Sequence, residues 1–221
     1  MLERTIAVVS PHSCLSCGRE GKLICNLCYP DICYTVPSRC YLCKAATENF
    51  AVCDKCKPKT ALRHVWVTTE FKDLAKVLVH RFKFERAQVG ASIIAGYLKD
   101  KLPFINDMLV VPVPTANSRV RLRGYDHATL LAKELAQLTR LPYSSTLARM
   151  GQTRQVGAKR QERTKQLEGA FRIIDEIATR NAKILLVDDV TTTGATLNEA
   201  ARTLKRAGAR QVNAVVFAQT R

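Results

Sequence analysis

The sequence predicts an α/β domain, with a parallel sheet flanked by helices, that follows a small cysteine-rich module. Three observations predict this architecture. Apolar strand-like runs alternate with helical patterns between residues 65 and 218, a hydroxyl-rich turn directly follows one of these runs, and all nine cysteines lie within the first 56 residues. A chain of 221 residues can build one or two domains with a core of their own. We expect the cysteine module over residues 1–58 and the α/β domain over residues 59–221.

The composition is that of an ordinary globular protein. No run approaches the ~18 apolar residues that a membrane-spanning helix needs. The first residues, MLERTIAVVSPHSC, lack the pattern of a secretory signal peptide. We therefore expect a cytoplasmic protein without membrane insertion.

The cysteine module contains four CxxC pairs, each of which can offer two sulfurs to one tetrahedral ion. Disulfides are the alternative, but a cytosolic chain would keep its cysteines reduced. Chain order favours one zinc ribbon over residues 14–28 and another over residues 40–56, while interleaved pairing and a single remaining ion stay open. Such ions would be structural, and Cys33 would be a free or buried thiol. The predicted zinc ligands are Cys14, Cys17, Cys25, Cys28, Cys40, Cys43, Cys53 and Cys56.

The α/β domain alternates strand-like and helical patterns after a short linker near residues 57–59. Buried-type apolar runs predict the strands, and apolar residues at helical spacing predict the helices. The predicted strands cover residues 65–69, 108–113, 184–187 and 212–218, with a further strand after 169–171. The predicted helices cover residues 71–82, 89–102, 125–139 and 197–207. The polar, basic stretch over residues 150–166 is a functional or disordered loop by its length.

Two acids and a hydroxyl-rich turn come directly after the strand over residues 184–187. We expect that strand to end at Asp188 and Asp189, ahead of a turn and a helix, the arrangement at which open α/β sheets bind ligands. Backbone N–H groups at the helix start, with threonine hydroxyls beside them, can cradle a phosphate monoester. The carboxylates would repel that phosphate, so they suit sugar hydroxyls or Mg²⁺. The stretch therefore predicts a ribose 5-phosphate site, with a merely structural capped turn as the alternative.

A second loop is expected beside this turn. It follows the strand over residues 108–113 and contains Thr115, Arg119, Arg121 and Arg123. Loops that follow neighbouring parallel strands meet at the same sheet edge. Because guanidinium groups bind phosphate oxygens in a forked geometry, these arginines suit a pyrophosphate.

The strand, acid pair and T-T-G-x-T turn over residues 183–198 closely resemble the phosphoribosyl-pyrophosphate (PRPP) signature of type I phosphoribosyltransferases. The resemblance implies that fold, and Mg²⁺ accompanying PRPP. By position, it places Asp188 and Asp189 on the ribose hydroxyls as the catalytic pair. It also places the turn on the 5-phosphate, through Thr191, Thr192, Thr193, Gly194, Ala195 and Thr196.

Nearly the whole chain resembles the ComF (GntX-like) family. The resemblance rests on the four CxxC pairs, Phe82-Lys83, the VPVP and RGY motifs over 111–114 and 123–125, a Gln155…Arg163…GAF segment, and the PRPP stretch. It implies handling of incoming single-stranded DNA in natural transformation, beside competence and other DNA-processing proteins. Lys83 and Arg163 join Thr115, Arg119 and Arg123 as implied ligand contacts. The chain departs from the family at Asp126-His127, where the family has Asn-Gln, and at Gln166, where it often has Asn.

The charge distribution favours a polyanion partner for the α/β domain. Of the formal net charge of +16, residues 1–58 contribute 7 − 5 = +2 and the rest +14. PRPP would use only some of these charges, so a groove that follows a phosphodiester backbone is expected, with strongly salt-dependent binding. The aromatic residues of the helical patterns favour core positions over base stacking: Phe71, Phe82, Phe84 and Tyr125.

Two readings of the function remain, besides a scaffold with an incidental site, which the residues favour least. The chain binds single-stranded DNA and a PRPP-type ligand, or it is an active phosphoribosyltransferase with an unknown acceptor. In the second reading, the acid pair stabilises a ribosyl cation and a loop over residues 154–165 closes over it. No nucleobase pocket, nucleophile or general base is identifiable in the sequence, and no histidine shows a catalytic partner pattern.

Overall fold

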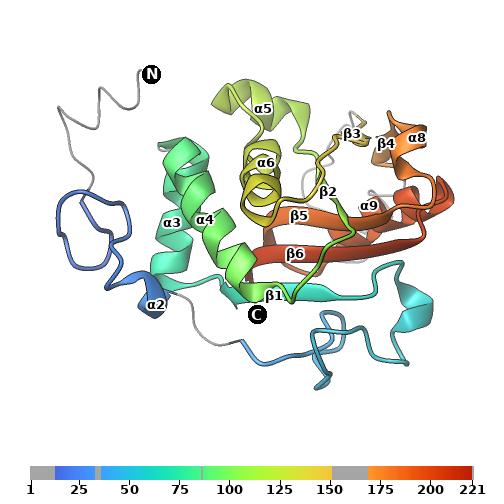
Figure 1. Ribbon diagram of the computed structural model, residues 1–221, viewed down its shortest axis with the longest axis horizontal. Helices are drawn as coiled ribbons and strands as arrows, with labels where there is room; N and C mark the ends of the chain where they lie inside the picture. The colour runs from blue at the N-terminus through green and yellow to red at the C-terminus, as the bar shows by residue number, and fades with distance from the viewer. Residues whose placement is uncertain (1–12, 33–35, 86, 151–168, 221) are drawn as a thin grey trace, which may run out of the picture.

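The fold is a four-stranded parallel sheet flanked by helices, with two cysteine-rich segments attached. The computed structural model describes residues 13–32, 36–85, 87–150 and 169–220 (Figure 1). The strand order in the sheet is β1-β6-β5-β2, and every neighbouring pair is parallel. The sheet strands are β1 (Val65–Glu70), β2 (Leu109–Pro112), β5 (Lys183–Thr191) and β6 (Gln211–Gln219). The α/β fold class and all four of these predicted strands are confirmed.

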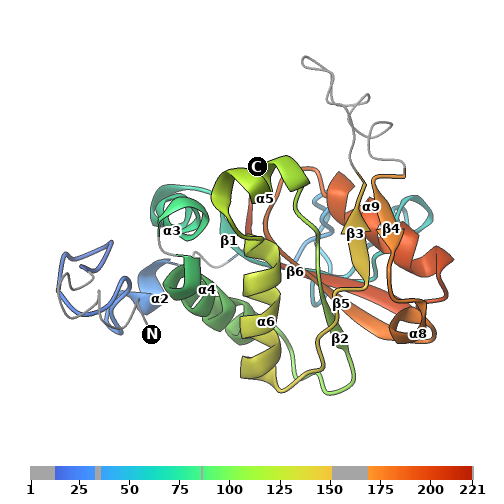
Figure 2. The same cartoon turned by 90° about the horizontal axis from the view of Figure 1, so that it is seen from above.

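Helices cover both faces of this sheet. On one face α4 packs against β1 and β6, and α6 packs against β2 and β5; α9 lies on the other face (Figure 2). The helices are α2 (Tyr29–Ile32), α3 (Asp73–Phe84), α4 (Ala87–Lys101), α5 (Asn117–Arg123), α6 (His127–Thr139), α8 (Glu176–Thr179) and α9 (Ala195–Arg206), with a 3₁₀ turn η1 (Lys57–Lys59).

The central strands are buried on both faces because their sequences are almost continuously apolar. Ile184, Leu185 and Leu186 of β5 have no exposed surface, and β6 is buried from Val212 to Ala218. Each such side chain stabilises the fold by about 1.5–3 kcal/mol when it leaves water. The hydrophobic effect therefore fixes the middle of the sheet and leaves its carboxyl edge to polar residues.

The structure corrects the expected end of the strand before the acids. β5 does not stop at Val187 but continues through both acids to Thr191, because β6 continues beside it and pairs Asp188 with Val216 and Val190 with Ala218. β2 ends earlier, at Pro112. The acids therefore lie on a stretch of β5 that extends beyond its neighbour β2.

The helix α5 and the strand β3 (Leu147–Arg149) were not predicted, whereas β4 (Phe171–Ile173) matches the further strand expected after residues 169–171. Residues of the expected arginine loop form the helix α5, which Gly124 ends in the left-handed conformation at φ +79°. β3 and β4 pair as an antiparallel ribbon. Most of the basic stretch over residues 150–166 lies outside the described residues.

The two cysteine segments have the same local structure. In the first, Gly18 N–H donates to the Cys14 carbonyl at 2.9 Å; in the second, Lys44 N–H donates to the Cys40 carbonyl at the same distance. Short antiparallel bridges close both loops, one between Ser13 and Glu20 and the other between Arg39 and Ala46. The sequence shows this repetition only as cysteine spacing.

The cysteine segments attach to different parts of the domain. The first (blue in Figure 1) docks on α4, where the Tyr29 and Tyr97 rings stack with centroids 4.0 Å apart. The second lies beside the start of β1, where Ala51 forms a bridge with His64 and Val65 N–H donates to the Phe50 carbonyl at 3.1 Å. Buried residues from both segments join one hydrophobic cluster with the sheet. Among the described residues, no helix is long and apolar enough to cross a membrane.

Candidate ligand site and metal groups

The acid pair lies at the carboxyl end of β5, and each carboxylate accepts a hydrogen bond from the next backbone N–H. Asp188 Oδ1 accepts from Asp189 N at 2.9 Å, and Asp189 Oδ1 accepts from Val190 N at 2.8 Å. Successive strand residues point to opposite faces of a sheet. The two acids therefore face different surroundings, although they are neighbours in sequence.

Asp189 is buried, with 3% of its surface exposed, and a cation from α3 faces it. Lys83 Nζ lies 2.5 Å from Asp189 Oδ2. Among the described residues this oxygen has no hydrogen-bond partner, so its contact with Lys83 is an ion pair. His127 Nε2, at the start of α6, lies 3.7 Å from the same oxygen.

The contacts of His127 fix its protonation and tautomer. Burial lowers the pKa of His127 to about 4, with Lys83 and Arg123 adding to the effect and Asp189 opposing it. The imidazole is therefore neutral near pH 7. Arg123 donates to Nδ1 at 2.9 Å, so the ring proton is on Nε2 and points toward Asp189.

A threonine–aspartate contact holds the start of α6 in place. Thr115 Oγ1, in the loop after β2, donates to Asp126 Oδ1 at 2.7 Å. Asp126 also caps α6 by accepting from Ala128 N at 3.0 Å. The loop after β2 and the start of α6 are thereby fixed beside the acids of β5.

The end of α3 is joined to the same region by side chains. Tyr125 Oη lies 2.9 Å from the Phe82 carbonyl and 2.8 Å from the Lys83 carbonyl, and it donates to them. The Arg123 guanidinium lies over the Phe84 ring, 4.8 Å from its centre. α3, α5, α6 and β5 therefore meet at one cluster of charged groups.

Asp188 differs electrostatically from an ordinary surface acid. Burial, followed by the nearby charge of Asp189, raises its pKa well above the usual value for aspartate, although Lys83 acts in the opposite direction. An incoming cation or a set of hydroxyl donors would relieve this repulsion. The acid pair is thus suited to Mg²⁺ or to vicinal sugar hydroxyls.

The hydroxyl-rich turn connects β5 to α9. Thr191 is buried and Thr192 is exposed. Gly194 is the N-cap residue of α9 and adopts the left-handed conformation at φ +76°. Thr193 Oγ1 accepts from Ala195 N at 3.3 Å. Ala195 and Thr196 open the helix and are half-buried. The turn therefore presents threonine hydroxyls and the amino end of a twelve-residue helix next to the acid pair.

A hollow elsewhere on the surface lacks this chemistry. It has a volume of about 350 Å³ and lies at the opposite edge of the sheet, against Met108, Pro142, Asn181 and Arg210. Its charged pair, Lys183 with Asp107, is partly exposed. We therefore assign the candidate site to the acid pair and the turn at the carboxyl edge.

The predicted ligand residues divide into three groups. Lys83, Thr115 and Arg123 lie in the cluster around Asp189 and His127. Arg119 is exposed on α5, away from any contact that ties it to the acids. Arg163 lies outside the described residues.

Sequence reasoning missed Asp126 and His127 as site residues. They stood out only as departures from the family pattern, yet they link the arginine helix to Asp189. Their position directly after Arg123-Gly124 was the available signal.

The aromatic residues of the helical patterns were expected in the core. This expectation is correct for Phe82 and wrong for Phe84, whose surface is 52% exposed.

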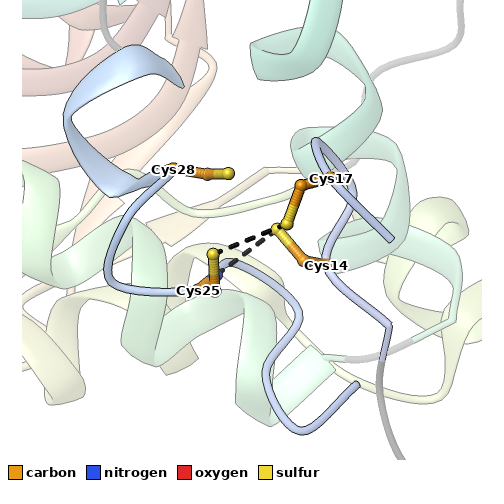
Figure 3. A group of neighbouring side chains, drawn as sticks. All are labelled: Cys14, Cys17, Cys25 and Cys28. Atoms are coloured by element: carbon orange, nitrogen blue, oxygen red, sulfur yellow. Dashed lines mark hydrogen bonds between the residues drawn. The ribbon is translucent and has the colours of Figure 1, made fainter. Parts of the chain in front are cut away.

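The eight paired cysteines form two separate groups in chain order. One contains Cys14, Cys17, Cys25 and Cys28, and Figure 3 shows their side chains pointing toward one another. The other contains Cys40, Cys43, Cys53 and Cys56. Within each group all sulfurs lie within 4.8 Å of one another. This geometry favours the sequential pairing, and Cys33 lies outside the described residues.

The sulfur positions fit a tetrahedral ion. The Cys17 and Cys25 sulfurs are 3.7 Å apart, and those of Cys43 and Cys53 are 3.4 Å apart. Four thiolates at the Zn–S distance of about 2.3 Å would be separated by about 3.8 Å. Burial raises the pKa of the Cys14 and Cys40 thiols, but hydrogen bonds from backbone N–H groups outweigh this effect. They lower the pKa of Cys14 to about 6 and that of Cys40 to about 7. Both groups could hold structural zinc.

Comparisons with known proteins agree with this architecture. Residues 123–221 match the phosphoribosyl transferase domain family. The chain is 29% identical to competence protein ComFC of Bacillus subtilis, over 86% of this chain and 92% of that protein. It is 26% identical to competence protein F of Haemophilus influenzae, over 78% of this chain and 81% of that protein. DNA utilization protein YhgH of Escherichia coli is 29% identical over 93% of each chain.

The chain is a homologue of these ComF-type competence and DNA utilization proteins. The expected family resemblance is therefore confirmed, as is the type I phosphoribosyltransferase fold. Among solved structures, a glutamine PRPP amidotransferase from B. subtilis aligns with 62% of this chain and 30% of its own, at 18% identity and a TM-score of 0.43. A likeness at that level bears on neither ligand nor activity.

Proposed function

We propose that this ComF-type protein acts in the cytoplasmic handling of single-stranded DNA during DNA uptake and binds a PRPP-type ligand with Mg²⁺ at its carboxyl edge. The names of its relatives, which include competence and DNA utilization proteins, support the process. The division into residues 1–58 and residues 59–221, with structural zinc in the first part, belongs to the same proposal.

The observation that carries the ligand proposal is the cluster at the end of β5. Asp189 is buried against Lys83 and near His127, while the hydroxyl-rich turn starts two residues later in the chain. A ribose 5-phosphate could place its phosphate on the turn and its hydroxyls toward the acids. Lys83 and Arg123 would then be available to the pyrophosphate, since both are cations at this edge.

Exposed cations support the DNA part of the proposal. Arg119 and Arg121 are exposed on α5, next to the half-buried Arg123. Arg123 in turn lies over Phe84, which could stack with a base because half of its surface is exposed. Positive charge next to an aromatic ring is the combination that single-stranded nucleic acid binds.

An active phosphoribosyltransferase is the second candidate. The match of residues 123–221 to that domain family supports it, and the acid pair would stabilise positive charge on the ribosyl group. Release of pyrophosphate from PRPP across a panel of bases and amines would favour this candidate, and release with none of them would count against it.

The experiment that tests ligand binding is a thermal shift titration with Mg²⁺ and PRPP. At a ligand concentration of about 100 times Kd, we expect the free energy of unfolding of wild type to rise by about 2.7 kcal/mol, which raises its Tm by several degrees. The double variant D188N/D189N should show no shift. Asp107→Asn, at the opposite edge of the sheet, is the matched control and should shift as wild type does. Equal shifts in all three proteins would remove the ligand assignment.

A further inference from the structure

The second cysteine group is in direct contact with the candidate phosphate turn. Tyr41 follows the metal-ligand candidate Cys40, and only 3% of its surface is exposed. Its ring lies against Gly194 so closely that a Cβ on this glycine would be 2.4 Å and 2.6 Å from two ring carbons. Any other residue at this position would collide with the ring and would also be strained at φ +76°.

A hydrogen-bonded chain holds the Tyr41 ring in this position. Thr60 Oγ1 donates its one proton to Asn198 Oδ1 at 2.8 Å, so at 2.6 Å it must accept from the Tyr41 hydroxyl. Asn198 N–H, in the first turn of α9, donates to the Gly194 carbonyl at 2.9 Å. The contacts therefore form a closed circuit from the metal group through Tyr41, Thr60 and Asn198 back to the turn.

The linker between the cysteine group and the sheet strengthens this circuit. Ala61 N–H donates to Asn198 Oδ1 at 3.0 Å, and the Asn198 amide donates to the Lys59 carbonyl at 3.1 Å. Arg202, one turn further along α9, donates to the same carbonyl at 3.1 Å. The amino end of α9 is thus fastened to the segment that directly follows Cys56.

From these contacts we infer that Tyr41 is a positioning residue that couples metal binding at the second cysteine group to phosphate binding at the turn. Metal bound by Cys40 and Cys43 holds the loop that carries Tyr41, and the ring holds Gly194 and the turn. By linkage, a ligand on the turn must then raise the equilibrium affinity of this group for the metal by the same factor by which the metal raises the affinity for the ligand. The inference rests on the proposed ligand function and deepens it.

The first cysteine group provides an internal control. The tyrosine through which this group docks, Tyr29, follows its fourth cysteine, stacks on Tyr97 and donates to Asp100 of α4 at 2.9 Å. These contacts are made with α4, which lies on the opposite face of the sheet from α9 (Figure 2). Metal in this group should therefore be indifferent to a ligand on the turn.

The test measures two quantities on the full-length zinc-loaded protein. Calorimetry with Mg²⁺ and PRPP gives the ligand affinity, and a chromophoric chelator gives the rate of zinc release with and without PRPP. Because most changes in affinity appear in the dissociation rate, we expect PRPP to slow the release of one of the two zinc ions by about tenfold. Tyr41→Ala should weaken PRPP binding by a similar factor and abolish the slowing of zinc release by PRPP. Tyr41→Phe keeps the ring, so it should keep most of the PRPP affinity and most of the slowing. Tyr29→Ala should match wild type in affinity and in the slowing.

Several outcomes would overturn the inference. If PRPP slows the release of neither ion, or of both equally, the wild type alone refutes the coupling, whether or not the variants fold. Equal PRPP affinity of wild type and a folded Tyr41→Ala refutes it while the proposed ligand function stands. Failure of wild type to bind PRPP refutes the inference together with the ligand proposal.

Discussion

Asp189 is the residue on which the candidate site depends most, because it is a buried acid that side chains from distant parts of the chain surround. Lys83 comes from α3 and His127 from α6, while Asp189 itself is on β5. A buried carboxylate without a counter-charge would be strongly unfavourable. In the free protein Lys83 therefore neutralises an acid that the ligand is proposed to use.

Removal of Lys83 should destabilise the fold more than removal of an exposed partner. The Lys83 and Asp189 side chains are only 20% and 4% exposed, so Lys83→Met leaves a buried charge unpaired and should lower the free energy of unfolding by about 3 kcal/mol. The matched control is Lys183→Met, whose pair with Asp107 is 32% and 54% exposed and should contribute less than about 1 kcal/mol. Urea denaturation measures both. Equal losses would contradict the assigned pair, and Asp189→Asn should rescue much of the Lys83→Met loss.

Neutral His127 should make stability depend on pH in an acidic window. Its pKa is about 4 in the folded protein against 6.5 ordinarily, so between these values the unfolded chain binds more protons. Stability should therefore fall by up to about 3 kcal/mol as the pH drops from 6.5 to 4, and no further below that. The groups that face the ring are Lys83, Arg123, Asp126 and Asp189.

The measurement for His127 is the difference between the pH–stability profiles of wild type and His127→Gln. This difference cancels the titration of other groups. A profile difference that is flat from pH 4 to 6.5 would show that the histidine is not buried in its neutral form.

At the scale of elements, the turn before α9 depends on a glycine for two separate reasons, conformation and space. Gly124 and Gly194 have nearly the same φ, +79° and +76°, but a Cβ at Gly124 meets nothing within 4 Å. Gly124→Ala should therefore destabilise the protein by about 1–2 kcal/mol through the backbone alone. Gly194→Ala should cost more, because the new methyl group also collides with Tyr41.

Urea denaturation of these two variants, with and without Tyr41→Ala, separates the two reasons. In the Tyr41→Ala background the excess cost of Gly194→Ala should largely vanish. An excess that persists would mean that the collision with the ring is not its source.

The predictability of each element followed from the range of the interactions that form it. The buried runs of β5 and β6 and the apolar spacing of α6 are local signals, so they were predicted. The basic seven-residue α5 has no apolar periodicity, and the extension of β5 through its acids depends on pairing with β6. The roles of His127 and Tyr41 depend on contacts with residues far away in the chain, which no local pattern reveals.

At the scale of the whole molecule, the excess positive charge predicts how DNA binding responds to salt. Binding of a labelled oligothymidylate, followed by fluorescence anisotropy, should weaken steeply between about 50 and 200 mM salt. Arg121→Ala on α5 should reduce the slope of log K against log salt by about 1. Lys99→Ala, at an exposed position in the last turn of α4, is the matched control and should leave the slope unchanged. A flat salt response of wild type would contradict the DNA proposal.

The central claim is that the acid pair and the hydroxyl-rich turn together bind a phosphorylated ribose. A crystal structure of the protein with Mg²⁺ and PRPP tests this most directly. The account predicts the 5-phosphate within hydrogen-bonding distance of the backbone N–H groups of residues 192–196, and the ribose hydroxyls, directly or through Mg²⁺, on Asp188 and Asp189. Ligand density at any other place, or a phosphate on the turn with the sugar directed away from both acids, would contradict it.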